Sequence, residues 1–178
     1  MLIAMAGLPG TGKSTLAAAV ATALGGVVLS KDVARAALFP ALVLDYSPAQ
    51  DDVAMAAVYA ATRVILSTRP PRVVVLDGRT FRKAAQVAGL FALGREIGRR
   101  PVVIECVCDD AIACERLARD AVEGTHPAGN RTPALHAAVR ATAEPLVVPR
   151  LTLDTGRLTL EECLTRALDH IRRGSPPG

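Results

Sequence analysis

The sequence predicts an α/β fold in which a five-stranded parallel sheet is covered by helices on both faces. Short apolar segments alternate with amphipathic stretches along the chain, which is the pattern of repeated strand and helix units. The strand segments are uniformly apolar, as expected for strands that are buried on both faces. The 178 residues, 51% of them hydrophobic, suit one compact domain. We expect that domain over residues 1–174, followed by a flexible tail at 175–178.

In the first half of the chain, strand candidates are short apolar runs and helix candidates carry apolar residues at helical spacing. Glycines at 25–26 end the first helix candidate, and Pro40 ends the second. Ser47 and Pro48 supply an N-cap and a first-turn proline for the third. In order, the pattern predicts a strand at 2–6, a helix at 14–24, a strand at 27–30, helices at 31–39 and 48–66, and a strand at 73–77.

In the second half, similar signals mark the helix starts. Asp109 or Asp110 can cap one helix, Thr132 precedes a first-turn proline, and Thr159 with Glu162 forms a capping box. The residues after Asp120 are polar, glycine-bearing and aperiodic, so we expect a loop there. The predicted order is a helix at about 83–99, a strand at 102–108, helices at 111–120 and 133–143, a strand at 150–154, and a last helix from 160.

Composition argues against several classes of protein. Apolar residues never run for the ~20 positions that a membrane span needs, and no signal sequence is recognisable. We therefore expect a cytoplasmic protein with no membrane contact and no obligate protein partner. The four cysteines form no CxxC pair, which favours free thiols over a disulfide framework or a zinc site. The net charge of +4 suits a protein that handles phosphates.

Residues 6–15, AGLPGTGKST, contain the most specific motif. Their spacing matches GxxxxGK(S/T), the P-loop, in which backbone N–H groups and a helix N-terminus cradle nucleotide phosphates. Lys13 would reach the β- and γ-phosphates, and the Ser14 hydroxyl can bind Mg²⁺. We expect ATP contacts along the whole motif, at Gly7, Pro9, Gly10, Thr11, Gly12, Lys13, Ser14 and Thr15.

Two acidic residues follow strand candidates and should lie at the same sheet edge as the P-loop. Asp77 ends VVVLD, where a carboxylate can support Mg²⁺; the alternative is a plain strand-end cap. Asp32 and Arg35 lie three apart in SKDVAR, on one helix face. A phosphoryl transferase needs a carboxylate to accept the proton of an attacking hydroxyl and a cation for the acceptor. Both are therefore candidates for catalysis and acceptor binding, with a helix cap and a surface arginine as the alternative.

Arginines after the fourth strand predict a lid over about 116–132. Loose phosphoryl-transfer transition states gain from positioned positive charge and from exclusion of water. Arg116, Arg119 and Arg131 are the candidates for this catalytic role, although each could be an ordinary solvated arginine.

Arg79, Phe81 and Arg82, just beyond Asp77, are candidates for gripping the acceptor, or else surface residues. Aromatic residues make up only 3% of the chain, so a stacking platform for a long single strand of nucleic acid is hard to build. This observation favours a small acceptor.

These stretches together resemble the P-loop kinases of the polynucleotide kinase type, which include zeta-toxin-like and small-molecule phosphotransferases. The resemblance extends through GLPGTGKST, SKDVAR, VVVLDGRTF and the arginine-containing segment. It implies a P-loop NTPase fold like that of nucleoside monophosphate kinases with a small lid, Asp32 as general base, and Arg35 against the acceptor. The segment PRLTLDTGRLTLEECL resembles the end of adenylylsulfate kinases, which implies that Thr155 and Gly156 lie near adenine.

The expected function is transfer of the γ-phosphate of ATP, with Mg²⁺, to a hydroxyl of a small molecule such as a metabolite, sugar, nucleoside or antibiotic. A polynucleotide 5'-hydroxyl is the alternative acceptor, which the positive net charge would suit. A nucleotide-dependent switch or ATPase without an acceptor is the alternative from another class.

Overall fold

The computed structural model describes residues 1–68, 72–124 and 128–174. The predicted tail at 175–178 lies outside these residues. Strands and helices follow one another in the predicted order. They are β1 Leu2–Ala6, α1 Lys13–Ala23, β2 Val27–Ser30, α2 Lys31–Leu38, α3 Pro48–Ser67, β3 Val74–Asp77, α4 Ala84–Glu96, β4 Val102–Val107, α5 Asp110–Glu123, α6 Pro133–Ala141, β5 Leu151–Asp154 and α7 Leu160–Gly174.

The strands form one five-stranded sheet with the order β2-β3-β1-β4-β5, and every pair is parallel. The predicted α/β fold class is confirmed. In register, Ser30 at the end of β2 lies beside Asp77 at the end of β3, and Ala6 lies beside Glu105 of β4. The carboxyl ends of the strands therefore bring loops from distant parts of the sequence to one edge.

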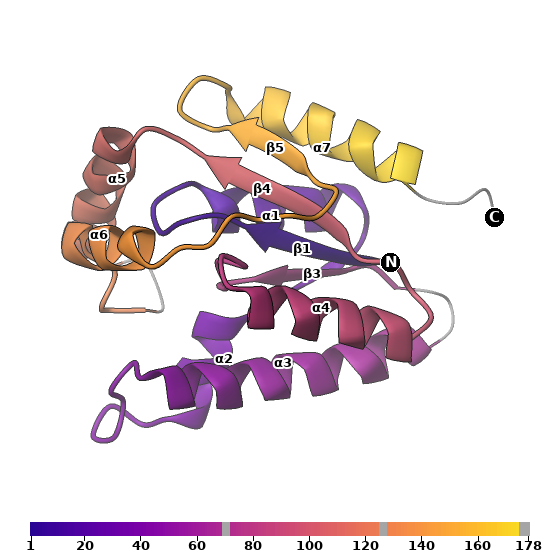
Figure 1. Cartoon of the computed structure of the whole chain (residues 1–178), viewed down its shortest axis with the longest axis horizontal. Coiled ribbons are helices and arrows are strands. Elements are labelled where there is room, and N and C mark those ends of the chain that lie inside the picture. The colour runs from indigo at the N-terminus through magenta and orange to yellow at the C-terminus, as the bar shows by residue number, and fades with distance from the viewer. Residues whose placement is uncertain (69–71, 125–127, 175–178) are drawn as a thin grey trace.

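Helices cover both faces of this sheet (Figure 1). Leu2 and Ala4 of β1 belong to a core cluster with α3 and α4, whereas Ile3 and Met5 belong to a second cluster with α1 and α7. Successive side chains of a strand point to opposite faces, so a strand that is buried on both sides must be apolar throughout. This requirement explains the uninterrupted apolar runs in the sequence.

Most helix starts are where the local signals place them. The Ser47 hydroxyl accepts a hydrogen bond from the backbone of α3, and Thr132 does the same for α6. Asp109 occupies the N-cap position of α5 without a side-chain capping bond. The predicted end of this helix at Asp120 is too early, because α5 continues to Glu123 and ends at Gly124 in the left-handed region, with φ 62°.

None of the described helices combines the length and the apolar character that crossing a membrane requires. The four cysteines are free thiols, of which Cys106 and Cys163 are buried.

Candidate active site

The P-loop joins β1 to α1 and depends on glycine at defined points. Gly7, Gly10 and Gly12 have φ of 129°, 81° and 78°, a region that other residues rarely adopt. A Cβ on Gly7 would lie 2.2 Å from the carbonyl oxygen of Cys106, and one on Gly10 would lie 2.5 Å from that of Ala113. The loop therefore packs against β4 and α5 so closely that side chains are excluded.

Lys13 is buried within this loop. Its Nζ donates a hydrogen bond to the Leu8 carbonyl at 2.6 Å. Burial lowers the pKa of Lys13 to about 8, the nearby Asp77 carboxylate opposes this shift, and Arg131 adds to it. The lysine is thus a weakly solvated cation close to both a carboxylate and an arginine.

A cavity of about 490 Å³, here named the α1–α7 cavity, opens beside the P-loop. Thr155 and Arg116 form part of its wall together. The two Nη atoms of Arg116 donate to Thr155 Oγ1 at 3.0 Å and to its carbonyl at 2.8 Å, and Thr155 Oγ1 lies 3.0 Å from the Thr11 carbonyl. Of the predicted nucleotide residues, those that line it are Gly10, Gly12, Lys13, Ser14, Thr15 and Thr155.

The other predicted nucleotide residues have different positions. Gly7 and Thr11 lie inside the loop, where the Gly7 N–H donates to Thr80 and the Thr11 hydroxyl donates to Leu8. A Cβ on Gly156 would lie 2.9 Å from Ile112 Cδ1. Pro9 lines a second cavity, described next, and Gly156 lines neither, so the nucleotide contacts expected of these two residues stay predictions.

The second cavity, of about 260 Å³, lies between α2 and α6 and is named the α2–α6 cavity. Asp32 and Arg35 from α2 both line it, and they form an ion pair at 2.9 Å. Arg35 is only 3% exposed, and its guanidinium carbon lies 4.6 Å from the centre of the Tyr46 ring. The reading of Arg35 as a solvated surface residue is therefore wrong.

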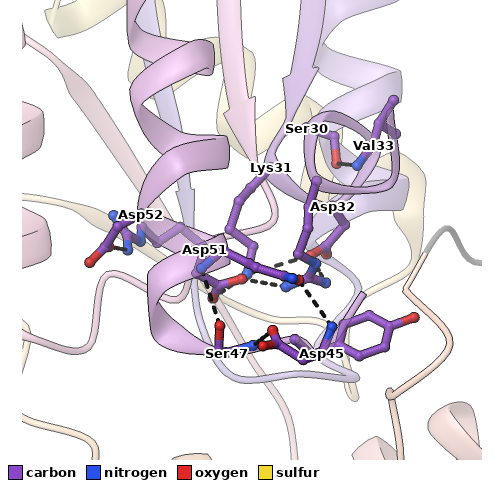
Figure 2. A network of polar contacts seen from close by, with 12 residues as sticks. Ser30, Lys31, Asp32, Val33, Asp45, Ser47, Asp51 and Asp52 are labelled. Carbon is purple, nitrogen blue, oxygen red and sulfur yellow. Dashed lines mark hydrogen bonds and ion pairs between the residues drawn. The ribbon is translucent and has the colours of Figure 1, made fainter. Parts of the chain in front are cut away.

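Lys31 and Asp51 complete a four-charge cluster that the sequence analysis missed. Figure 2 shows Lys31 and Asp32 of α2 directed toward Asp51 of α3. Lys31 Nζ lies 2.7 Å from Asp51 and 3.4 Å from Asp32, and Arg35 also pairs with Asp51. Asp51 carried no separate sequence signal, because an acidic residue in the first turn of a helix is explained by the helix dipole alone.

Asp77 ends β3 next to these residues. Its side chain is 5% exposed, and its Oδ1 has no hydrogen-bond partner among the residues that the structure describes. A buried carboxylate oxygen without a partner is costly, so the site fits a ligand that supplies positive charge or a proton.

Residues of the loop between β3 and α4 divide between the cavity and the core. Arg79 and Arg82 line the α2–α6 cavity, but they pair with carboxylates outside it, Asp52 at 2.6 Å and Glu105 at 2.7 Å. Phe81 corrects the prediction of an acceptor contact. Its ring is 1% exposed in the core cluster below α3 and α4, because the residue has the unusual φ of 53° and turns inward.

The predicted lid of residues 116–132 begins within α5 and ends just before α6. Residues 116–123 belong to α5, residues 125–127 lie outside the described part of the chain, and 128–132 precede α6. Arg119 lines neither cavity and pairs with Glu115 at the surface, so its catalytic role stays a prediction. Arg131 lines both cavities and pairs with Asp120 at 3.1 Å.

His136 of α6 is a buried contact to the P-loop that sequence reasoning did not find. Its Nδ1 donates to the Pro9 carbonyl at 2.8 Å, and its Nε2 lies 3.1 Å from Asp110 Oδ1. A lone histidine on a helix gives no sequence signal of a partner 127 residues away. The helix that covers the α2–α6 cavity is therefore attached directly to the loop beneath it.

The two cavities meet at the P-loop. Lys13, Ser14 and Arg131 line both of them. A group bound at these three residues is accessible from both cavities. We call this place the junction of the two cavities; it carries two basic side chains and one hydroxyl.

The chain is similar to known proteins both in sequence and in structure. A family model described as AAA domain matches residues 2–154. A candidate kinase from Chloroflexus aurantiacus is similar in structure, with 27% identity, a TM-score of 0.75, and coverage of 95% of this chain and 97% of the other. No curated protein sequence matches the chain.

Two more distant structures share the fold. A gluconokinase from Sinorhizobium meliloti has 18% identity and a TM-score of 0.67, with 97% of this chain and 91% of the other covered. Kti12 from Chaetomium thermophilum, solved with ADP-AlF3, has 16% identity and a TM-score of 0.68, with 96% of this chain and 99% of the other covered.

Proposed function

Because the chain belongs to the AAA domain family and has the P-loop kinase fold, we propose that it transfers the γ-phosphate of ATP to a hydroxyl of a small molecule. The observation that carries the proposal is the junction of the two cavities at Lys13, Ser14 and Arg131. A transferred phosphoryl group must touch its donor and its acceptor in line, so two binding spaces that meet at a P-loop lysine suit this reaction.

The α1–α7 cavity is assigned to ATP. The backbone of the P-loop would hold the phosphates, and Lys13 would exchange its bond to the Leu8 carbonyl for phosphate oxygens. Thr155, held by Arg116, would form the wall toward the base. Arg131 lies at the junction, where a cation stabilises charge on the group in transfer.

Asp77 and Ser14 fit a magnesium ion that accompanies the nucleotide. Asp77 Oδ1 is buried without a partner among the described residues, and the exposed Ser14 hydroxyl lines both cavities. Carboxylate and hydroxyl oxygens are suitable Mg²⁺ ligands. When bound, the ion would neutralise charge on the β- and γ-phosphates.

The α2–α6 cavity is assigned to the acceptor. Asp32 would accept the proton as the acceptor oxygen forms its bond to the γ-phosphorus and the bond from that phosphorus to the β-bridging oxygen breaks, which releases ADP. Lys31 and Arg35 hold the carboxylate in place at 3.4 and 2.9 Å.

Asp32→Asn tests this assignment. The amide keeps the shape of the side chain but cannot accept the proton, so kcat should fall by at least about 100-fold. The Kd for ATP should change less than about threefold, because Asp32 lies on the acceptor side. Asp169→Asn, which changes an exposed carboxylate of α7, is the control and should leave both values unchanged. Normal turnover by folded Asp32→Asn protein would show that another group is the base.

The acceptor class is tested with γ-labelled ATP against sugars, nucleosides, hydroxylated antibiotics and oligonucleotides with a 5'-hydroxyl. Label in a small molecule supports the proposal. Label only in the oligonucleotide would favour the polynucleotide alternative, with binding that weakens steeply as salt rises. ATP hydrolysis that no acceptor stimulates would favour the switch or ATPase alternative.

A further inference from the structure

The lining of the α2–α6 cavity is strongly biased toward positive charge. Seven basic side chains line it, but only two carboxylates do, those of Asp32 and Asp51. An acceptor that offers only hydroxyl groups needs hydrogen-bond partners rather than a surplus of cations. The bias therefore carries information about the acceptor.

Four of the basic residues have other tasks. Lys31 and Arg35 are neutralised by Asp32 and Asp51 within the four-charge cluster (Figure 2). Lys13 and Arg131 lie at the junction with the α1–α7 cavity, where the triphosphate accounts for them. Three cations are then left to explain.

The three remaining cations, Arg79, Arg82 and Lys83, lie together on the loop between β3 and α4. No carboxylate that lines the cavity pairs with them in the described structure. Arg79 pairs with Asp52, which is 73% exposed. Lys83 Nζ donates to a neutral group, the Thr142 carbonyl.

Arg82 also retains excess charge. Its carboxylate partner, Glu105, is shared with Arg150, so two guanidinium groups face one acid. The Arg82 Nε is buried and has no hydrogen-bond partner among the described residues. Glu144 lies nearby, but its carboxylate caps α4 through the Ala84 N–H and does not line the cavity.

The walls of the cavity favour a small ligand over a polymer. The Tyr46 hydroxyl accepts a hydrogen bond at 3.0 Å from the Gly129 N–H, which links the segment before α3 to the segment before α6. Leu135 and Val139 of α6 line the same space, whose volume is about 260 Å³. A ligand of this size fits as a whole between the linked walls.

We infer that the acceptor is a small hydroxy compound with an anionic group, a carboxylate or a phosphate, which binds to Arg79, Arg82 and Lys83. The inference rests on the proposed function for the position of the acceptor. With the anion held on this loop, the hydroxyl end of the compound is directed toward Asp32 and the junction. The guanidinium groups of the two arginines and the ammonium group of the lysine can donate charge-assisted hydrogen bonds to either a carboxylate or a phosphate.

The test compares acceptors that differ only in the anion. Glucose, gluconate and glucose 6-phosphate form one set, and glycerol, glycerate and glycerol 3-phosphate form another. Binding is measured by calorimetry with a non-hydrolysable ATP analogue and Mg²⁺ present, and transfer is measured with γ-labelled ATP. At least one anionic member should bind about tenfold more tightly than its neutral counterpart. Tighter binding of gluconate or glycerate would indicate a carboxylate, and tighter binding of glucose 6-phosphate or glycerol 3-phosphate would indicate a phosphate.

Lys83→Gln locates the anion. This change leaves no carboxylate without its partner, because Lys83 bonds only to a carbonyl oxygen in the described structure. It should weaken binding of the preferred anionic compound about fivefold to tenfold and leave the neutral counterpart within twofold. Arg63→Gln removes one charge from the surface pair between Arg63 of α3 and Glu96 of α4 and is the control, with no change expected for either compound.

The outcomes separate this inference from the proposed function. Anion-selective binding that Lys83→Gln abolishes, without phosphate transfer, would support the site and contradict the kinase assignment. Transfer to neutral compounds as readily as to anionic ones would support the kinase and overturn the inference. The inference is equally overturned if no anionic member binds more tightly than its neutral counterpart, or if a 5'-hydroxyl oligonucleotide is the preferred acceptor.

Discussion

Lys13 lies where the two cavities meet, and the P-loop encloses its ammonium group. Its Nζ donates a hydrogen bond to the Leu8 carbonyl at 2.6 Å. Burial lowers the pKa of Lys13 to about 8, although Asp77 favours the charged form. At neutral pH the lysine therefore remains a cation with little hydration to lose, which is favourable for binding an anion.

Nucleotide affinity should fall as the pH rises above 8. Below that pH Lys13 is protonated and can bind phosphate oxygens, and above it the neutral amine cannot. The Kd for ADP should be flat from pH 6.5 to 7.5 and then increase toward about tenfold per pH unit. Calorimetric titration of ADP at each pH measures this profile.

Lys13→Arg is the matched variant for this titration. Arginine stays charged throughout the range, so the Kd of the variant should be independent of pH even if it is weaker. A flat profile for the unchanged protein would show that Lys13 does not titrate at the binding site.

The residues of the candidate site differ in how far the sequence could reveal them. The P-loop could be read because its glycines recur at a fixed spacing within one short stretch, where three of them have positive φ. The atoms that exclude side chains at Gly7 and Gly10 belong to Cys106 and Ala113, far away in the sequence. Phe81 could not be placed, since its direction depends on one backbone angle in an irregular loop. Asp51 could not be assigned because it meets Arg35 only when α3 packs on α2.

At the scale of elements, the start of α3 connects a local signal to the site. The Ser47 hydroxyl accepts a hydrogen bond from the Gln50 N–H at 3.3 Å, and Asp51 follows in the same first turn. Because Asp51 binds Lys31 and Arg35 of α2, this turn sets the position of the four-charge cluster.

Ser47→Ala should lower the free energy of unfolding by about 1 kcal/mol, the usual cost of losing a helix N-cap. For a chain of this length the change corresponds to a Tm lower by about 2–4 °C. Amide exchange at Gln50 and Asp51 should accelerate, because the first turn of α3 frays. Ser47→Asn, which can still cap, should restore both values; equal losses in the two variants would mean that capping is not the cause.

Elements were predictable to the extent that their signals are local. The cap at Ser47, the one at Thr132 and the capping box at Thr159 depend on residues within one turn, and all three are present. The end of α5 was misplaced because the stretch after Asp120 is aperiodic and contains Gly124, although its first three residues, 121–123, continue the helix and are exposed. The local sequence pattern does not distinguish the exposed last turn of a helix from an irregular loop.

At the scale of the whole molecule, the alternation of elements predicted the sheet but not its strand order. In the order β2-β3-β1-β4-β5, β1 lies between strands that follow it by many residues. This arrangement brings the loop after β3 next to β4 and the approach to β5. Glu105 of β4 connects these segments. It pairs with Arg82 of the loop after β3 at 2.7 Å and with Arg150, just before β5, at 2.6 Å. It also accepts a longer hydrogen bond, at 3.3 Å, from Thr152 of β5.

Glu105→Gln should therefore cost much more stability than the loss of an ordinary ion pair. Glu105 is 2% exposed, and its removal leaves two guanidinium groups facing a neutral amide in a poorly hydrated place. The expected loss is about 3 kcal/mol, or a Tm lower by about 6–12 °C. Thermal unfolding followed by circular dichroism measures it.

The control for this prediction is Glu96→Gln, which alters the exposed pair of Glu96 with Arg63. Exposed pairs contribute at most about 1 kcal/mol, so Tm should fall by no more than about 4 °C. A loss in Glu105→Gln no larger than that in the control would mean that water or movement of Arg82 compensates the missing charge. A large loss would show that the contacts of Glu105 with Arg82, which lines the α2–α6 cavity, and with Arg150, just before β5, stabilise the fold.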